Sequence, residues 1–312
     1  MDPVTHTLFG LAIGEAVFRP RLGRRAVTVS AWAANLPDID GLAMLIPDAG
    51  AVILRRSFGH SLFLLPAWIV GLSWIFRKKY PDMAWRDLLA VIGVGAAGHM
   101  LFDLVNSFGV QLFWPFSTTR PEISIIFIID LMLTGILAAP HLARLKTEWR
   151  PKLTAAARGA LACVAIYFVA AFSARARALS ILSGEAGGAA FQYAFPEPLG
   201  AHRWRGVVKD EAQWRVYLVD SVRGTAEKRL VLPDAGATAP AVAANATPFG
   251  RRLSTFFKAP VWTVEPAAGG GTVASVYDLR FTSLTLKRGT PFQYFFDVGP
   301  DGGAIPRGTK IW

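Results

Sequence analysis

Long apolar runs occupy the first 173 residues of this chain and constrain its fold more than any other feature. A helix needs about 20 apolar residues to cross the hydrocarbon layer of a bilayer. Runs of this length lie at residues 58–76, 88–113, 123–142 and 155–174. Over the whole chain 53% of the residues are hydrophobic and only 18% are charged, which is typical of a membrane protein rather than a soluble one. The pattern predicts an all-α membrane bundle with four spans.

Two shorter apolar runs, at residues 7–18 and 26–36, precede these four. At about 1.5 Å per residue, neither crosses about 30 Å of hydrocarbon without help from its flanking residues. They form either two thin spans or a helical hairpin that enters and leaves the membrane on the same side. The sequence leaves both arrangements open.

Lysine and arginine are distributed unevenly between the loops that separate the apolar runs. Three alternate loops carry thirteen of these residues, within 19–25, 77–86 and 144–158, whereas the other loops carry three, at 55, 56 and 120. Basic loops tend to stay in the cytoplasm. We therefore expect a multi-pass protein of the cell inner membrane, with its N-terminus and everything after residue 174 on the outer, periplasmic side. The net charge of +11 then belongs largely to these loops, and no nucleic-acid partner is expected.

The remainder of the chain, residues 174–312, predicts a small, mostly β domain outside the membrane. Alternating apolar residues predict strands at 214–219, 273–277, 279–286 and 291–298. Residues 233–250 are rich in Ala, Pro, Thr and Asn, which indicates a flexible loop. The single cysteine, Cys163, excludes an intramolecular disulfide and a cysteine-based zinc module. We therefore expect two domains, a transmembrane helical domain at 1–173 and an extramembrane domain at 174–312.

His99 and Asp103 are two polar residues inside the apolar run at 88–113. Residues four apart project from one face of a helix, and Asn106 lies on that face as well. An imidazole and a carboxylate one turn apart can bind the same metal ion, and ionisable groups at membrane depth usually mark function. The alternative is a hydrogen-bonded polar pair between packed helices.

Four more side chains of metal-ligand type lie at the predicted outer ends of the apolar runs. They are His6, Asp38, Asp40 and His60. Asp103 lies in the outer half of its predicted span, so the six side chains converge toward one side of the membrane. Taken singly, the two loop aspartates fit a turn cluster after a proline, and the two histidines fit interfacial residues. Taken together, the six predict a metal site.

Four motifs with these residues follow one another along the first 116 residues. They are Asp-Pro-x-Thr-His at 2–6, Leu-Pro-Asp-x-Asp at 36–40, Arg-x-Phe-x-His-Ser at 56–61, and His-x-x-x-Asp at 99–103 with Gly-Val-x-Leu-x-Trp-Pro-Phe at 109–116. This order resembles the YdjM family of membrane-bound, metal-dependent hydrolases, over about residues 1–140. That family is similar in turn to zinc-dependent phospholipase C and related nucleases. The resemblance implies that His60, His99, Asp103 and one of Asp38 and Asp40 ligate metal, with His6 as a further ligand.

The chain departs from that pattern in two places. Arg55 stands where many family members have a histidine, and no second His-x-x-x-acid pair follows Asp103. The resemblance therefore implies one or two divalent ions, zinc or manganese, rather than a site for three.

Three further charged residues accompany these motifs. Arg55 and Arg56 precede His60 and either clamp a phosphate or contact lipid headgroups. Asp130, inside the run at 123–142, either supports a ligand histidine or bonds Asn106 or another helix. The sequence leaves these alternatives open.

The predicted activity is metal-dependent hydrolysis of a phosphoester or another bond in a lipid-like, amphiphilic substrate drawn from the membrane lipid. Asp38 or Asp40, whichever is not a ligand, would serve as the general base. One alternative is a non-catalytic membrane anchor or interaction protein, in which the polar cluster only holds helices together. Another is an ion-coupled transporter, although the chain shows no internal repeat of the kind that transporters often carry.

Overall fold

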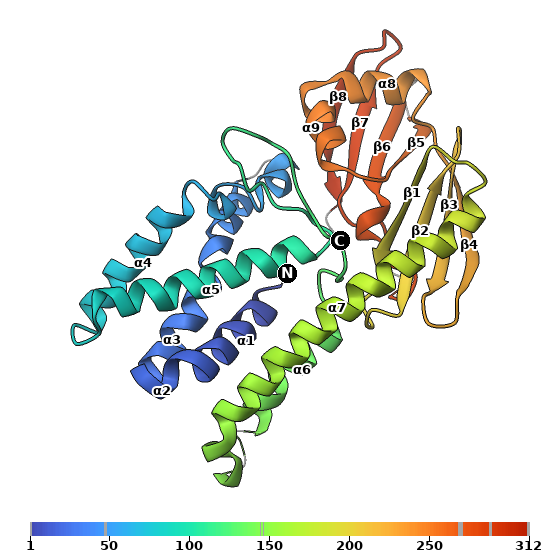
Figure 1. Cartoon of the computed structure of the whole chain (residues 1–312). Helices are drawn as coiled ribbons and strands as arrows, with labels where there is room; N and C mark the ends of the chain where they lie inside the picture. Colours follow the sequence, from blue (N-terminus) through green and yellow to red (C-terminus); the bar gives the residue numbers. More distant parts are fainter. Residues whose placement is uncertain are drawn as a thin grey trace. The chain divides into compact units, whose positions relative to one another are not determined.

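The computed structural model (Figure 1) describes residues 2–46, 49–143, 145, 147–267, 271–286 and 289–310. The chain divides into two compact units. The first comprises Met1–Ala43 and Leu54–Phe172, and the second comprises Met44–Ile53 and Ser173–Trp312.

The elements described up to Ala186 are all helices. Asp2 starts the first helix, because its side chain accepts a hydrogen bond from the Thr5 amide at 3.0 Å, as N-cap residues do. The α-helices are α1 (Pro3–Ile13), α2 (Arg19–Leu22), α3 (Arg24–Ala33), α4 (Leu65–Lys79), α5 (Trp85–Val105), α6 (Leu131–Ala143) and α7 (Leu153–Ala186). A π-helical turn (Gly14–Phe18) joins α1 to α2, and 3-10 segments lie at Leu36–Leu45, Ala49–Leu54, Phe58–His60 and Thr147–Lys152.

Helices α1, α3 and α5 pack side by side in the first unit (Figure 1). Glycines allow the close approach. A Cβ atom on Gly10 would lie 2.7 Å from the Ala31 Cα, and one on Gly95 would lie 2.7 Å from the Ala33 Cβ. Small residues at helix contacts are typical of membrane bundles. This packing brings the N-terminal end of α1, the C-terminal end of α3 and the C-terminal half of α5 together.

Two helices are long and apolar enough to cross a membrane, Trp85–Val105 and Arg150–Ala186. A third candidate is the pair Gly50–His60 and Leu65–Lys79, which is bent by 74° at its break. The four predicted spans are therefore not confirmed among the described residues, which support two or three. The helix of the run at 88–113 ends at Val105, and that of the run at 123–142 begins only at Leu131.

Polar side chains explain both of these shortened helices. Asn106 follows α5 with an extended backbone, and its side chain accepts the amide hydrogen of Phe108 at 2.8 Å. Asp130 accepts the Leu133 amide hydrogen at 2.9 Å, which starts α6. The 13 residues of α6 extend about 20 Å at the usual rise, less than the hydrocarbon thickness.

The second unit contains two four-stranded antiparallel sheets, each with its strands in sequence order (Figure 1). Core side chains come from both sheets, among them Phe195, Trp214, Val261 and Tyr277. The first sheet is β1 (Phe191–Pro196), β2 (Arg203–Lys209), β3 (Gln213–Asp220) and β4 (Thr225–Pro233). The second is β5 (Pro260–Pro266), β6 (Thr272–Asp278), β7 (Gln293–Val298) and β8 (Ala304–Lys310).

Three of the predicted strands match β3, β6 and β7, and two predictions for this region are wrong. The predicted strand at 279–286 begins instead with a 3-10 turn, Leu279–Phe281, because Asp278 accepts the Arg280 amide hydrogen. The predicted loop at 233–250 contains α8 (Ala239–Ala246) and the start of α9 (Pro248–Phe256). Alanine has the highest helix propensity, and the Thr247 side chain caps α9 by accepting the Gly250 amide hydrogen at 2.9 Å.

Candidate metal centre

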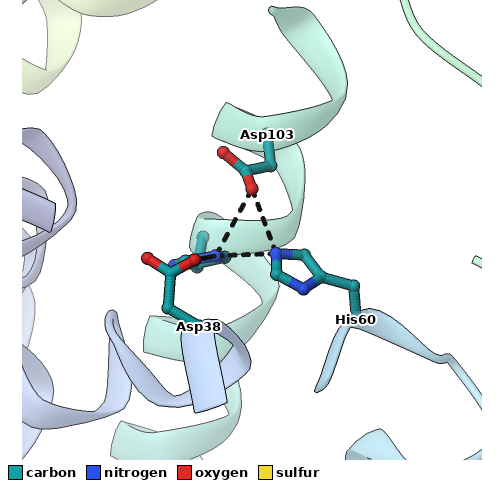
Figure 2. A group of neighbouring side chains, drawn as sticks. Asp38, His60 and Asp103 are labelled. Carbon is teal, nitrogen blue, oxygen red and sulfur yellow. Dashed lines mark hydrogen bonds and ion pairs between the residues drawn. The ribbon is translucent and has the colours of Figure 1, made fainter. Parts of the chain in front are cut away.

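Four side chains of the first unit form one group of ligand atoms. Asp38, His60, His99 and Asp103 each offer one atom, and these atoms all lie within 4.8 Å of one another. Figure 2 shows Asp38, His60 and Asp103 pointing toward a common point from three chain segments. Asp38 belongs to the 3-10 segment Leu36–Leu45, His60 ends the turn Phe58–His60, and His99 and Asp103 project from α5.

The Nδ1 atoms of His60 and His99 form hydrogen bonds outside this group of four. His60 Nδ1 lies 2.8 Å from Asp40 Oδ2, and His99 Nδ1 lies 2.7 Å from the Ala34 carbonyl oxygen. Burial raises the pKa of Asp40 to about 6, so this carboxylate is still mainly ionised at pH 7. Both partners are acceptors, so we assign the ring proton to Nδ1 in each histidine. Both Nε2 atoms then present a lone pair to the group.

The resulting donor set fits a cation. The two Nε2 atoms are 3.0 Å apart, and two lone pairs at that distance repel each other unless a positive charge lies beside both. Asp103 Oδ2 is 3.0 Å from His60 Nε2 and 3.6 Å from His99 Nε2. Imidazole nitrogens with carboxylate oxygens suit zinc and other divalent transition metals. A hydrogen acceptor behind each ligand histidine is also usual at metal sites.

His6 and Asp40, the other two predicted ligands, lie next to the group rather than in it. His6 Nε2 is 3.2 Å from Asp103 Oδ1, the second oxygen of that carboxylate, and the His6 ring stacks on His99 with centroids 3.6 Å apart. Asp40 lies behind His60 and also accepts the Ser57 amide hydrogen at 2.8 Å. Its contacts are those of a residue that orients a ligand.

Arg56 is turned inward, toward Asp103. Its Nε is 2.6 Å from Asp103 Oδ2, its Nη1 donates to Asn106 Oδ1 at 2.7 Å, and the residue is only 4% exposed. Asn106 in turn donates to Asp103 Oδ1 at 3.2 Å. In this structure Arg56 therefore contacts Asp103 and Asn106 rather than lipid headgroups. Arg55 is one-third exposed, and its Nη2 lies 3.3 Å from Asp38 Oδ1.

Asp130 lies outside the group of four. Besides the Leu133 amide, it accepts the Tyr167 hydroxyl hydrogen at 2.8 Å. It therefore links α6 to α7, which is the helix-bonding alternative considered for this residue.

Sequence reasoning missed the backbone parts of the site. The Ala34 carbonyl oxygen and the Ser57 amide carry no signal in the sequence, because nearly every residue has a backbone carbonyl and a backbone amide. Gly59 is a third such residue, since a Cβ atom there would lie 2.0 Å from the Pro37 carbonyl oxygen. The sequence shows that Gly59 precedes His60, but it does not show that the segment with Pro37 packs against Gly59.

Comparison with protein-family models matches residues 1–178, which contain all of these residues, to the YdjM inner membrane protein. The chain belongs to the YdjM inner membrane protein family. It is also similar to the uncharacterized protein YfhP of Bacillus subtilis (strain 168), with 28% identity over 137 residues. That alignment covers 42% of this chain and 42% of YfhP. No solved structure matches the chain.

Proposed function

We propose that this YdjM-family protein is a membrane-bound, metal-dependent hydrolase. Its ligands would be His60, His99, Asp103 and Asp38. The observation that carries the proposal is the pair of buried Nε2 atoms, 3.0 Å apart, beside two carboxylates, with an acceptor behind each ring. A polar cluster that served only to join helices would be expected to place a hydrogen between those nitrogens.

Zinc or manganese fits this mixed nitrogen and oxygen set. A divalent ion bound there would lower the pKa of a water molecule and polarise an ester oxygen. His6, on the second oxygen of Asp103, would allow a second ion. The proposal therefore covers one or two ions.

The chain's own residues divide the remaining tasks. Ala34 and Asp40 orient the two histidines. The Asp38 side chain is 13% exposed, whereas those of His60, His99 and Asp103 are fully buried. Asp38 is thus the carboxylate that a substrate and its water reach first. The aspartate outside the ligand set, Asp40, was expected to be the general base, but it is buried behind His60. We therefore assign the base role to Asp38, which would also contact the ion.

The proposed substrate is a phosphoester of a lipid-like molecule. Arg55, beside Asp38, places a partly exposed positive charge at the approach to the group, and guanidinium groups bind phosphate oxygens well. An apolar helical unit with a polar site suits an amphiphile from the membrane lipid. With the predicted orientation, hydrolysis would occur at the outer face of the inner membrane, where the second unit would also lie.

A non-catalytic membrane anchor is the second candidate. The observation that favours it is the Arg56–Asp103 ion pair at 2.6 Å, because an arginine already compensates one carboxylate of the group. In that case the cluster would only stabilise helix packing.

Hydrolysis assays on the detergent-purified, full-length protein distinguish the two candidates. We expect release of phosphate or phosphorylated headgroup from phospholipid phosphoesters that requires added zinc or manganese. His99→Ala should lower this rate by about 100-fold or more, because losing even a residue that orients a ligand costs about 10–100-fold. Asp130→Asn, which changes a buried carboxylate outside the group, should retain the rate. The proposal fails if metal-loaded protein cleaves no phosphoester, or if His99→Ala is as active as the wild type.

A further inference from the structure

Large apolar side chains are exposed where the turn after His60 meets the loop that follows α5. Leu62 and Phe63, in the turn, are 46% and 56% exposed. Phe113 and Phe116, in the loop, are 46% and 78% exposed. The rings of Phe63 and Phe116 contact each other edge to face, with centroids 5.0 Å apart. These four residues are called the apolar patch below, and exposed apolar clusters of this kind mark surfaces that contact a partner or a membrane.

Hydrogen bonds attach the patch to the segment that carries part of the candidate metal centre. The Leu62 amide donates to the Leu112 carbonyl oxygen at 3.0 Å. The Gln111 amide donates to the Arg56 carbonyl oxygen at 2.8 Å. Both bonds join the loop to the segment that also holds His60, two residues before Leu62. The patch is therefore fixed relative to the proposed ligands.

The length of α4 indicates what covers the patch. This helix is the longer part of the bent candidate span, begins at Leu65 just after Phe63, and ends with the basic residues Arg77, Lys78 and Lys79. Basic residues at the end of a span lie at the level of the lipid headgroups. The 15 residues of α4 extend about 22 Å, so its start lies about 8 Å inside a hydrocarbon layer that is about 30 Å thick. The side chains just before α4 therefore lie in hydrocarbon.

The exposed apolar surface continues from the patch along α4. Val70 and Trp74 are each about half exposed, and residues four apart lie on one face of a helix. Ile75, next to Trp74, is equally exposed. In a membrane span, such a face contacts lipid acyl chains. The patch extends this lipid-facing surface beyond the start of the helix.

A change of composition within the loop marks the edge of the hydrocarbon. The four residues after Phe116, at 117–120, are Ser-Thr-Thr-Arg. Arg120 Nη1 donates to the Arg55 carbonyl oxygen at 3.0 Å, and the partly exposed Arg55 side chain lies beside Asp38. Hydroxyl-bearing and charged side chains thus lie next to the patch. The boundary between hydrocarbon and headgroups passes between the two.

We propose that the apolar patch inserts into the acyl chains of one leaflet and holds the candidate metal centre at the level of the lipid headgroups. Phospholipid is the partner that covers the patch. The insertion does not rest on the proposed hydrolase activity. If that activity holds, the phosphoester of a membrane lipid lies level with Asp38 and Arg55 without leaving the bilayer.

Spin-label accessibility in nanodiscs of phosphatidylcholine and phosphatidylglycerol tests this proposal. Full-length protein with Cys163→Ser would carry a nitroxide at Phe116→Cys or, separately, at Thr118→Cys. Thr118 is the matched control, because it is exposed in the same loop but on the polar side of the proposed boundary. Oxygen concentrates in hydrocarbon, whereas a nickel chelate stays in water. We expect the ratio of oxygen to nickel accessibility to be several-fold higher for Phe116→Cys than for Thr118→Cys.

Leu62→Cys keeps the test decisive if Phe116→Cys does not fold, because Leu62 belongs to the other segment of the patch and should give the same high ratio. Equal ratios in the patch and at Thr118→Cys would overturn the proposal, since no hydrocarbon boundary would then separate them. Low accessibility of the patch labels to both reagents would also overturn it, because protein, such as a second copy of the chain, would then cover the patch. The measurement requires neither bound metal nor turnover, so its result is separate from that of the hydrolysis assay.

Discussion

At the scale of single residues, the candidate metal centre includes groups that would not touch the proposed ion. Asp40 bonds His60 Nδ1 at 2.8 Å and holds the lone pair of Nε2 toward the group of four. Replacing it with alanine would leave the ring free to rotate or to change tautomer. Loss of such an orienting partner usually costs 10–100-fold in metal affinity.

We therefore predict that Asp40→Ala weakens zinc binding by about 10–100-fold, measured by competition with a chromogenic chelator. Asp130→Ala is the control. It also removes a buried carboxylate, but one whose partners are Leu133 and Tyr167, so it should lower the unfolding temperature and leave zinc affinity unchanged. Wild-type affinity in Asp40→Ala would refute the orienting role.

Arg56 provides a second residue-scale prediction. It is buried, and it pairs with Asp103 and Asn106. Arg56→Met would leave Asp103 without its cationic partner, and breaking a buried pair in this way costs about 3–5 kcal/mol. We expect unfolding at a lower temperature, and partial recovery of that temperature on adding zinc, because an ion would then supply the missing charge. No recovery with zinc would count against a metal at Asp103.

The side chains of the site were predictable from sequence because their types are diagnostic. Histidine and aspartate inside or beside apolar runs are rare and costly, and four of the six predicted ligands form one group. The roles within the six were not predictable. Whether Asp38 or Asp40 enters the group depends on the path of a 3-10 segment, which residue types alone do not determine.

At the scale of elements, a close approach between two segments brings the proposed ligands together. A Cβ atom on Gly59 would lie 2.0 Å from the Pro37 carbonyl oxygen. This contact joins the turn that carries His60 to the segment that carries Asp38. A side chain at residue 59 would force the two segments apart.

We predict that Gly59→Ala lowers both metal content and stability, the latter by about 1–3 kcal/mol as overpacking does. Gly71→Ala is the matched control, since a Cβ atom there meets nothing within 4 Å and alanine favours the helix. Thermal unfolding and elemental analysis of the two variants give the comparison. Wild-type metal content in Gly59→Ala would show that the approach is not required.

Helix existence was easier to predict than helix ends. Apolar composition predicted helical segments at each long run, but it did not reveal that Asn106 ends α5 or that Asp130 begins α6. Both are polar residues that bond nearby amides, and such local competition with helix hydrogen bonds is invisible to a hydropathy window. The 74° bend before α4 is a similar case, since the apolar run continues through it.

At the scale of the whole molecule, the difference in secondary structure between the two units follows the difference in their composition. The apolar first part is helical, and the alternating pattern after residue 190 gives antiparallel sheets. Helix α8 was missed because its alanine and proline content is also typical of loops. Helix α9 was missed because its first residues lie in the same stretch. Proline at the first turn and a threonine cap could have predicted α9.

Membrane orientation yields a prediction at this scale. Cys163 is the single cysteine, so Cys163→Ser provides a background for new labelling sites. In intact cells whose outer membrane has been made permeable, V222C, in the exposed turn after β3, should react with a membrane-impermeant maleimide. R86C, in the exposed first turn of α5 and predicted to be cytoplasmic, should react only after lysis. The opposite pattern would overturn the orientation predicted from the basic loops.

Metal content tests the central claim most directly. The full-length protein, purified in mild detergent without a metal-affinity tag, would be measured by inductively coupled plasma mass spectrometry beside His99→Ala/Asp103→Ala. We predict roughly one or two equivalents of zinc or manganese in wild type and loss of that metal in a folded double variant. No metal in the wild type after reconstitution with zinc, manganese, iron or magnesium, or equal metal in both proteins, would contradict it.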